Sequence, residues 1–153
     1  MPHRFDLRVY YEDTDLAGIV YYANYLKFIE RARSEWVRTL GLDQTALRAE
    51  SGIVFAVRRV EADFVAPARF DDALHVLTEP VAATPARLVL RQTVLRDADV
   101  LFTALVTLVA LAASGRPARL PSALREHLPA GLPRDPMKGP ATDPATDPRK
   151  SAK

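Results

Sequence analysis

The run from Val100 to Ala112, VLFTALVTLVALA, constrains the fold more than any other part of the chain. It is apolar at both alternating sets of positions, which is typical of a strand covered on two faces but is also compatible with a buried helix. The β-branched residues and the Asp97-Ala98-Asp99 turn before the run favour a strand. A sheet built on it needs cover on both faces. We therefore expect a helix on one face and tight curling or self-association to protect the other.

The helix that this sheet requires is indicated by the segment from about Tyr22 to Leu40, which lacks glycine and proline. Its apolar residues recur at helical spacing: Tyr25, Phe28, Ile29, Ala32, Trp36 and Leu40. Gly41 ends the pattern. Asp43 is placed to cap a second short helix that runs through Glu50 and ends at Gly52.

Strand periodicity dominates the rest of the folded part. The predicted strands are Phe5–Tyr11, Val54–Val65, Ala73–Glu79 bounded by Asp71-Asp72 and Pro80, Arg87–Leu95 and the Val100–Ala112 run, with a last short helix at Pro121–Leu128. The order is strand, long helix and then four strands. We predict an α+β fold in which an antiparallel sheet wraps around one long central helix.

The charge distribution separates a folded body from a tail. The chain has 153 residues, 48% of them hydrophobic, which suits one domain with a sizeable core, predicted at residues 1–132. Residues 133–153 hold five of the 21 basic and three of the 19 acidic residues, so the remaining 16 of each sign cancel in the body. The body is not basic enough to favour nucleic acid as a partner. The tail is Pro-rich, with an ATDP-ATDP tandem and almost no apolar side chains, and we predict that it is disordered.

Several chemistries have no support in the residue types present. The chain lacks cysteine, and its three histidines are far apart, so we expect no disulfide, no metal site and no cofactor. Neither a Gly-x-Ser-x-Gly nor a Gly-x-Gly-x-x-Gly motif occurs, which leaves serine hydrolase and dinucleotide-binding functions unsupported. No leader or transmembrane segment is recognisable, and the predicted location is the cytoplasm.

An acidic turn precedes the long helix. Glu12, Asp13 and Asp15 fall within four residues and are followed by Gly18, which permits a tight turn and close approach of a ligand. In most proteins such a pattern serves turn formation and helix capping. The alternative is catalysis, because unpaired N–H groups at a helix start can stabilise a developing oxyanion beside a carboxylate. Asp15 is the best placed of the three. We expect Asp13 to accept hydrogen bonds from turn amides, and Glu12 to face solvent.

The segment RVYYEDTDLAGIVYYANYLKFIERAR, with FVAPARFDD and RLP later in the chain, resembles the hotdog-fold acyl-CoA thioesterases of the 4-hydroxybenzoyl-CoA thioesterase superfamily. Within that superfamily it is similar to the Tol-Pal-associated branch. The resemblance covers residues 5 to 128 and leaves the tail outside. It implies a hotdog fold, hydrolysis of acyl-CoA to a carboxylic acid and free CoA, and a homodimer or homotetramer.

The resemblance also implies roles for individual residues. Asp15 falls on the catalytic carboxylate, which acts as nucleophile or as general base on water. Tyr22 falls at the N-terminus of the hotdog helix, where a backbone N–H points at the thioester carbonyl, and Tyr11 matches a tyrosine that lines the site. The branch usually has histidine at the position of Tyr22, so a mechanism that depends on that imidazole does not carry over.

The phosphates of CoA need cations near the acyl site. The resemblance points to Arg87, at a strand start, and to Arg116 or Arg119, before the last helix; Arg58, Arg59 and Arg69 are further candidates. A second function from another class stays open at this stage. It is a non-catalytic hotdog module that binds acyl groups or partner proteins, with weak association of the basic tail at the inner face of the cell envelope. Asp15 discriminates between the two, because a binding module does not need a carboxylate there.

Overall fold

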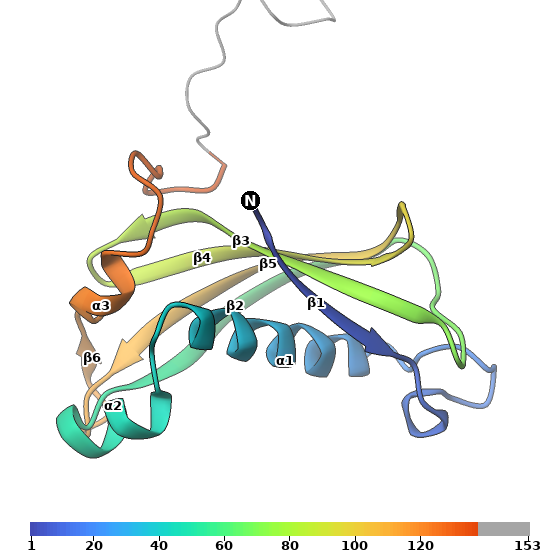
Figure 1. Ribbon diagram of the computed structural model, residues 1–153, viewed down its shortest axis with the longest axis horizontal. Coiled ribbons are helices and arrows are strands. Elements are labelled where there is room, and N and C mark those ends of the chain that lie inside the picture. The colour runs from blue at the N-terminus through green and yellow to red at the C-terminus, as the bar shows by residue number, and fades with distance from the viewer. Residues whose placement is uncertain (138–153) are drawn as a thin grey trace, which may run out of the picture.

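A six-stranded antiparallel sheet curves around one long helix in the computed structural model, which describes residues 1–137 (Figure 1). The strands are β1 (His3–Arg8), β2 (Val54–Phe64), β3 (Ala73–Thr84), β4 (Arg87–Arg96), β5 (Asp99–Leu111) and β6 (Pro117–Ala118). The helices are α1 (Asn24–Thr39), α2 (Gln44–Ser51) and α3 (Ser122–Arg125), with a 3₁₀ turn at Tyr11–Asp13. The sheet order is β1-β3-β4-β5-β2, and β6 pairs with β5. The predicted α+β arrangement around a central helix is confirmed.

The doubly apolar run forms strand β5, as predicted. Its inward residues Phe102, Ala104, Val106, Leu108 and Ala110 are at most 5% exposed. The alternate residues from 103 to 111 are only half-buried on the outer face. One chain therefore covers one face of this strand fully and leaves the other partly open to solvent.

Strand β3 is longer than the sequence predicted. Pro80 was expected to end it, but the strand continues to Thr84. The register against β4 shifts between Pro80 and Ala82. A bulge is one of the few places in a sheet where the missing N–H of proline is tolerated, so Pro80 does not break the pairing. The short strand β6 was not predicted either, because two residues carry no periodicity.

The predicted C-terminal ends of α1 and α2 are confirmed, whereas the last helix, predicted at Pro121–Leu128, is limited to Ser122–Arg125. Gly41 follows α1 with a positive φ of 78°. Asp43 caps α2, since its Oδ1 accepts hydrogen bonds from the N–H groups of Thr45 at 2.9 Å and Ala46 at 3.1 Å. Gly52 ends α2 with φ 73°, and a Cβ there would lie 2.9 Å from the Cβ of Ala113. Glycine is therefore required at this position by both backbone conformation and space.

The first residues of the predicted tail lie against the sheet. The carbonyl of Pro133 accepts a hydrogen bond from the N–H of Ala83 at 3.0 Å. The carbonyl of Arg134 accepts one from Nη2 of Arg87 at 3.1 Å. Residues 138–153, the rest of the predicted tail, lie outside the described residues. Among residues 1–137 no helix has both the length and the apolar character needed to cross a membrane.

Candidate active site

The acidic motif forms a small hairpin in front of α1. The N–H of Asp15 donates to the carbonyl of Ile19 at 2.9 Å, and the N–H of Tyr21 donates to the carbonyl of Asp13 at 2.9 Å. A bridge between Thr14 and Val20 lies between these two pairs. The N–H of Val20 also donates to the carbonyl of Ala68 at 2.8 Å, which fixes the hairpin to the loop after β2. We call residues 13–21 the acidic hairpin.

Asp13 holds the acidic hairpin together. It is 8% exposed, and its Oδ2 accepts a hydrogen bond from the N–H of Tyr10 at 2.8 Å. Its carbonyl accepts from Nδ2 of Asn24 at 2.9 Å, which ties the hairpin to the first residue of α1. The expectation that Asp13 binds turn amides is confirmed. Glu12 is exposed, also as expected.

Asp15 lies at the tip of the acidic hairpin with its carboxylate in solvent. Oδ1 accepts a hydrogen bond from the N–H of Ala17 at 2.9 Å. Within residues 1–137 the second oxygen, Oδ2, has no hydrogen-bond partner. Gly18 has φ 77° and open space around it, and its N–H donates to the carbonyl of Asp15 at 3.0 Å. The turn therefore orients Asp15 through one oxygen and leaves the other available.

Helix α1 starts without a side-chain cap. Its N-cap is Ala23, which has no side chain that can accept a hydrogen bond. The N–H groups of Asn24, Tyr25 and Leu26 donate to the carbonyls of the residues three positions earlier. The N–H groups of Tyr22 and Ala23 donate to no other atom of the described residues. Two backbone donors and the positive end of the helix dipole are therefore open at this end.

Aromatic side chains surround the start of α1. Tyr22 is 62% exposed, and its ring meets the rings of Tyr21 and Phe64 edge-on, with centroids 4.9 and 6.0 Å apart. Tyr25 is buried and stacks on Phe102 at 5.1 Å. Its hydroxyl oxygen accepts a hydrogen bond from the N–H of Ala68 at 3.0 Å. Burial raises the pKa of the Tyr25 phenol, and the Ala68 N–H lowers it by a smaller amount. Tyr25 is therefore a neutral structural residue.

Tyr11 and the predicted phosphate-binding arginines lie in different places. Tyr11 is 83% exposed at the base of the acidic hairpin, with its ring 6.1 Å from that of Phe70. Arg87 starts β4 opposite Val109, whereas the acidic hairpin adjoins the end of the sheet that contains Phe102. Seven residues of β5 separate these two levels, which is roughly 23 Å.

Arg116 and Arg119 share the end of the sheet occupied by Arg87. The carbonyl of Arg116 accepts a hydrogen bond from the N–H of Ala112, just beyond β5, and Arg119 directly follows β6. A single chain therefore brings Asp15, Gly18, Tyr11 and Tyr22 together and leaves the three arginines at the opposite end.

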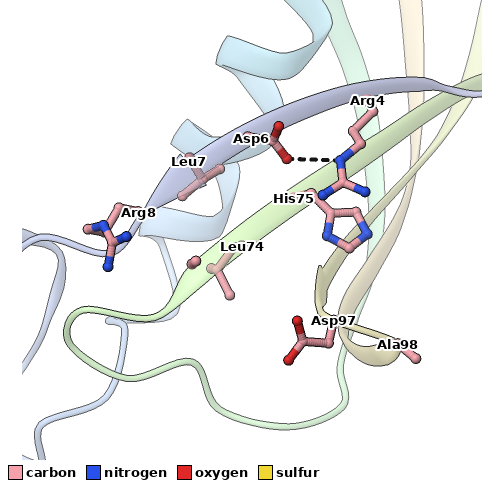
Figure 2. A pocket seen from close by; sticks show the side chains of 9 residues that line it. Arg4, Asp6, Leu7, Arg8, Leu74, His75, Asp97 and Ala98 are labelled. Carbon is pink, nitrogen blue, oxygen red and sulfur yellow. Dashed lines mark hydrogen bonds and ion pairs between the residues drawn. The ribbon is translucent and has the colours of Figure 1, made fainter.

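An open hollow of about 710 Å³ lies beside β1 and the β4–β5 turn, lined by Arg4, Asp6, Arg8, His75 and Asp97 among others (Figure 2). Its cations already have partners. Nε of Arg4 lies 2.9 Å from Oδ1 of Asp6, and Nη1 of Arg8 lies 3.2 Å from Oδ1 of Asp71. No sequence-predicted site residue lines this hollow. No group of three His, Asp or Glu side chains suited to a metal ion occurs in residues 1–137.

Sequence reasoning missed two residues that shape the site. Asn24 joins α1 to the acidic hairpin, and Phe64 provides the aromatic ring that faces both Tyr22 and Tyr25. An Asn at a helix start is a recognisable signal, but it is usually interpreted as a cap. Phe64 gave no signal, because only the fold brings the end of β2 beside the start of α1.

Comparison with known proteins identifies the family. Residues 9–128 match the thioesterase-like superfamily. The chain belongs to this superfamily. It is 42% identical over 102 residues to the acyl-CoA thioesterase YbgC of Haemophilus influenzae, covering 67% of this chain and 75% of that protein. It is 44% identical over 105 residues to the acyl-CoA thioester hydrolase YbgC of Escherichia coli O6:H1, covering 64% and 78%.

A solved structure of a probable thioesterase has a similar fold. A probable thioesterase from Bartonella henselae is 38% identical, with a TM-score of 0.76, over 79% of this chain and all of that chain. The hotdog fold and the family resemblance predicted from the sequence are confirmed, and the YbgC relatives agree with the predicted Tol-Pal-associated branch.

Proposed function

We propose that this protein hydrolyses acyl-CoA thioesters to a carboxylic acid and free CoA. One observation carries the proposal. Among residues 1–137, the start of α1 has two N–H groups without an acceptor, and the acidic hairpin before it presents a carboxylate with one oxygen that accepts no hydrogen bond. The YbgC relatives, at 42–44% identity, are named as acyl-CoA thioesterases or thioester hydrolases.

The start of α1 supplies the electrostatic part of the reaction. Negative charge develops on the carbonyl oxygen when a thioester is attacked. Backbone N–H groups already oriented by the helix can donate to that oxygen without further reorganisation. The N–H of Tyr22 is the donor that we assign to this role. The aromatic rings of Tyr21 and Phe64 next to it shield the thioester from water.

Asp15 supplies the second part, in one of two ways. As a nucleophile, it attacks the carbonyl carbon, expels the CoA thiolate and forms an anhydride that water then hydrolyses. As a general base, it takes a proton from the attacking water. A single turnover in ¹⁸O-labelled water distinguishes these routes. In the nucleophilic route, attack of water on the aspartyl carbon of the anhydride leaves an Asp15 oxygen in the product and ¹⁸O in the Asp15 carboxylate, whereas the general-base route puts ¹⁸O into the product and none into Asp15.

Self-association is the second part of the proposal, as a homodimer or a homotetramer. Strand β2 is a free edge of the sheet, with Val54, Val57, Val60 and Phe64 between 37% and 52% exposed. Two β2 strands paired antiparallel across a two-fold axis cover this edge. The same pairing places the Val54 end of one copy beside the Phe64 end of the other. Arg116 of the second copy then approaches the acidic hairpin of the first, where the CoA phosphates need a cation.

Sedimentation tests the assembly. We expect a dimer or tetramer at micromolar concentration, and Val54→Lys should shift it toward monomer by placing charge on the paired edge outside the apolar space between α1 and β2. Glu61→Lys, on the outer face of the same strand, is the control for charge alone. A wild-type monomer at these concentrations contradicts the proposal.

Release of free thiol from a panel of acyl-CoAs, ranging from short aliphatic to aromatic groups, tests the activity itself. Turnover with at least one member supports the hydrolase. Binding of acyl-CoA without any thiol release would favour the alternative, a non-catalytic acyl-binding module. The cytoplasmic location and weak association of the tail with the inner envelope face stay predictions, and cell fractionation of the full chain and of a chain ending at residue 137 checks both.

A further inference from the structure

An apolar groove runs along α1 from the proposed site. A space of about 500 Å³ lies between α1 and the inner face of β2, lined by Leu26, Ile29, Val57 and Val60 together with the charged residues Lys27, Glu30 and Arg33. At one end, Phe64 of β2 meets Tyr22, whose N–H is assigned to the thioester carbonyl. At the other end lies Arg33. Leu26, Ile29 and Arg33 form one stripe of α1, and Leu26 follows Tyr22 by four residues, so the groove points toward the proposed site.

Arg33 is an unusual residue to find at the end of an apolar groove. It is half-buried, and burial lowers the pKa of its guanidinium, although the charge of Glu30 partly offsets this effect. Nη1 of Arg33 donates to Oε1 of Gln92 at 2.9 Å. No carboxylate lies within 4 Å of Arg33 in residues 1–137. The guanidinium stays charged at neutral pH and keeps donors without a protein acceptor.

Gln92 holds Arg33 in position. It is fully buried, and its Nε2 donates to the carbonyl of Ile29 at 2.8 Å and to Oγ1 of Thr78 at 3.0 Å. Because Nε2 is used twice, Oε1 must face the guanidinium. The network therefore draws the end of the Arg33 side chain back to the level of Ile29, one turn nearer to Tyr22.

Glu30 stands beside Arg33 on the groove wall. Its carboxylate accepts a hydrogen bond from Oγ of Ser34 at 3.1 Å and makes no ion pair within 4 Å among the described residues. The end of the groove therefore offers a cationic donor and an anionic acceptor close together. A hydroxyl group complements this pair, since it can accept from Arg33 and donate to Glu30. A carboxylate satisfies Arg33 but is repelled by Glu30.

We infer that the groove holds the acyl group, and that Arg33 with Glu30 forms a subsite for a hydroxyl group at the far end of a medium-length chain. This inference rests on the proposed function. The seven residue-to-residue steps from Tyr22 to Ile29 advance about 10 Å along the helix axis. An extended chain advances about 1.2 Å per bond, so about eight bonds reach from the thioester to the guanidinium.

The test compares three substrates of equal length by thiol release: octanoyl-CoA, 8-hydroxyoctanoyl-CoA and the monothioester of octanedioic acid. We expect kcat/KM for the hydroxylated chain to exceed that for octanoyl-CoA by about tenfold, the scale of a hydrogen bond to a charged group. In Arg33→Met the ratio of kcat/KM for the hydroxylated chain to kcat/KM for octanoyl-CoA should fall to about one. In Arg33→Lys part of the preference for the hydroxylated chain should remain. Glu30→Gln should raise kcat/KM for the carboxylated chain relative to the hydroxylated one.

A ratio measured within one variant cancels general losses of folding or activity. Arg38→Met is the matched control, because Arg38 lies on the same helix, is exposed and pairs with Glu35 at 2.8 Å; its ratio should equal that of the wild type. Hydrolysis of octanoyl-CoA without a preference for the hydroxyl overturns this inference alone, as does an Arg33→Met enzyme that keeps the preference.

A change of sedimentation in Arg33→Met with an unchanged ratio would instead assign the groove to a second copy of the chain, and overturns the inference. Absence of thiol release from all three substrates and from the broader panel overturns the proposed function, and this subsite with it.

Discussion

The two main helices begin differently, although an aspartate precedes each. At α2, Asp43 accepts hydrogen bonds from the N–H groups of Thr45 and Ala46, so the helix start is closed by its own side chain. At α1, Ala23 occupies the N-cap position and makes no such bond. Asp13 and Asp15 are instead used within the acidic hairpin. The α1 start therefore keeps its donors open to a ligand.

The difference shows how one residue type serves structure at one place and chemistry at another. A capping aspartate typically contributes about 1 kcal/mol to stability, which α1 forgoes. Burial of Phe28, Ile29 and Ala32 against the sheet makes this loss tolerable. Stability from packing thus leaves the helix start free for function, and the following changes test this comparison.

The largest expected effect is that of Asp15→Asn. If the carboxylate attacks the thioester or activates water, turnover should fall by at least about a hundredfold. Asparagine retains an oxygen that can accept from the N–H of Ala17, so the turn and the fold should persist. Steady-state kinetics and circular dichroism check the two parts. Asp43→Asn, which keeps the cap of α2, is the control, and an Asp15→Asn enzyme of near wild-type activity would remove this carboxylate from the mechanism.

The second largest effect is expected for Asp13→Ala, which should lower the stability of the protein and, as a consequence, its turnover. It removes the acceptor of the Tyr10 N–H in a buried place, which typically costs about 1–3 kcal/mol of unfolding free energy. Turnover should fall as well, because the acidic hairpin that positions Asp15 loosens. Urea unfolding measures the first effect. Asp13→Asn, which still offers an oxygen to Tyr10, should lose much less, and equal losses in both variants would show that this bond does not hold the hairpin.

Local patterns were sufficient for most of the fold. The alternation of β5, the stripe of α1 and the ends at Gly41 and Gly52 depend on neighbours in the chain, so the sequence predicted them. Pro80 was misinterpreted because a bulge depends on the register of β3 against β4.

The site was predictable only in its local part. Asp15, Gly18 and Tyr22 lie within eight residues, and their grouping at the acidic hairpin followed from the motif. The position of Arg87 at the opposite end of the sheet depends on strand lengths and pairing, which no short motif encodes. The role of Phe64 and the Arg33–Gln92 bond, which joins residues 59 positions apart, could not be found for the same reason.

Tyr22→Phe separates the contribution of the Tyr22 backbone N–H to turnover from that of the Tyr22 hydroxyl. The backbone N–H is unchanged, the ring can keep its contacts with Tyr21 and Phe64, and the hydroxyl has no hydrogen bond within residues 1–137. We expect turnover to fall by less than about tenfold, which is about 1.4 kcal/mol on the barrier. Tyr22→Pro removes the N–H and should cost far more, with circular dichroism as the check on α1. A Tyr22→Phe enzyme as inactive as Asp15→Asn would make the hydroxyl a catalytic group.

The smallest expected effect on catalysis is that of Asp43→Ala, the counterpart of the first substitution at the other helix. It removes the cap of α2 and should lower the unfolding free energy by about 1 kcal/mol. Turnover should stay unchanged, because the N–H groups at the start of α2 bind no substrate. Water can accept their hydrogen bonds once the Asp43 carboxylate is removed. Urea unfolding and steady-state kinetics on the same preparation measure both quantities. A large drop in turnover without dissociation of the assembly would mean that the starts of α1 and α2 are functionally coupled. The start of α2 would then not have a purely structural role.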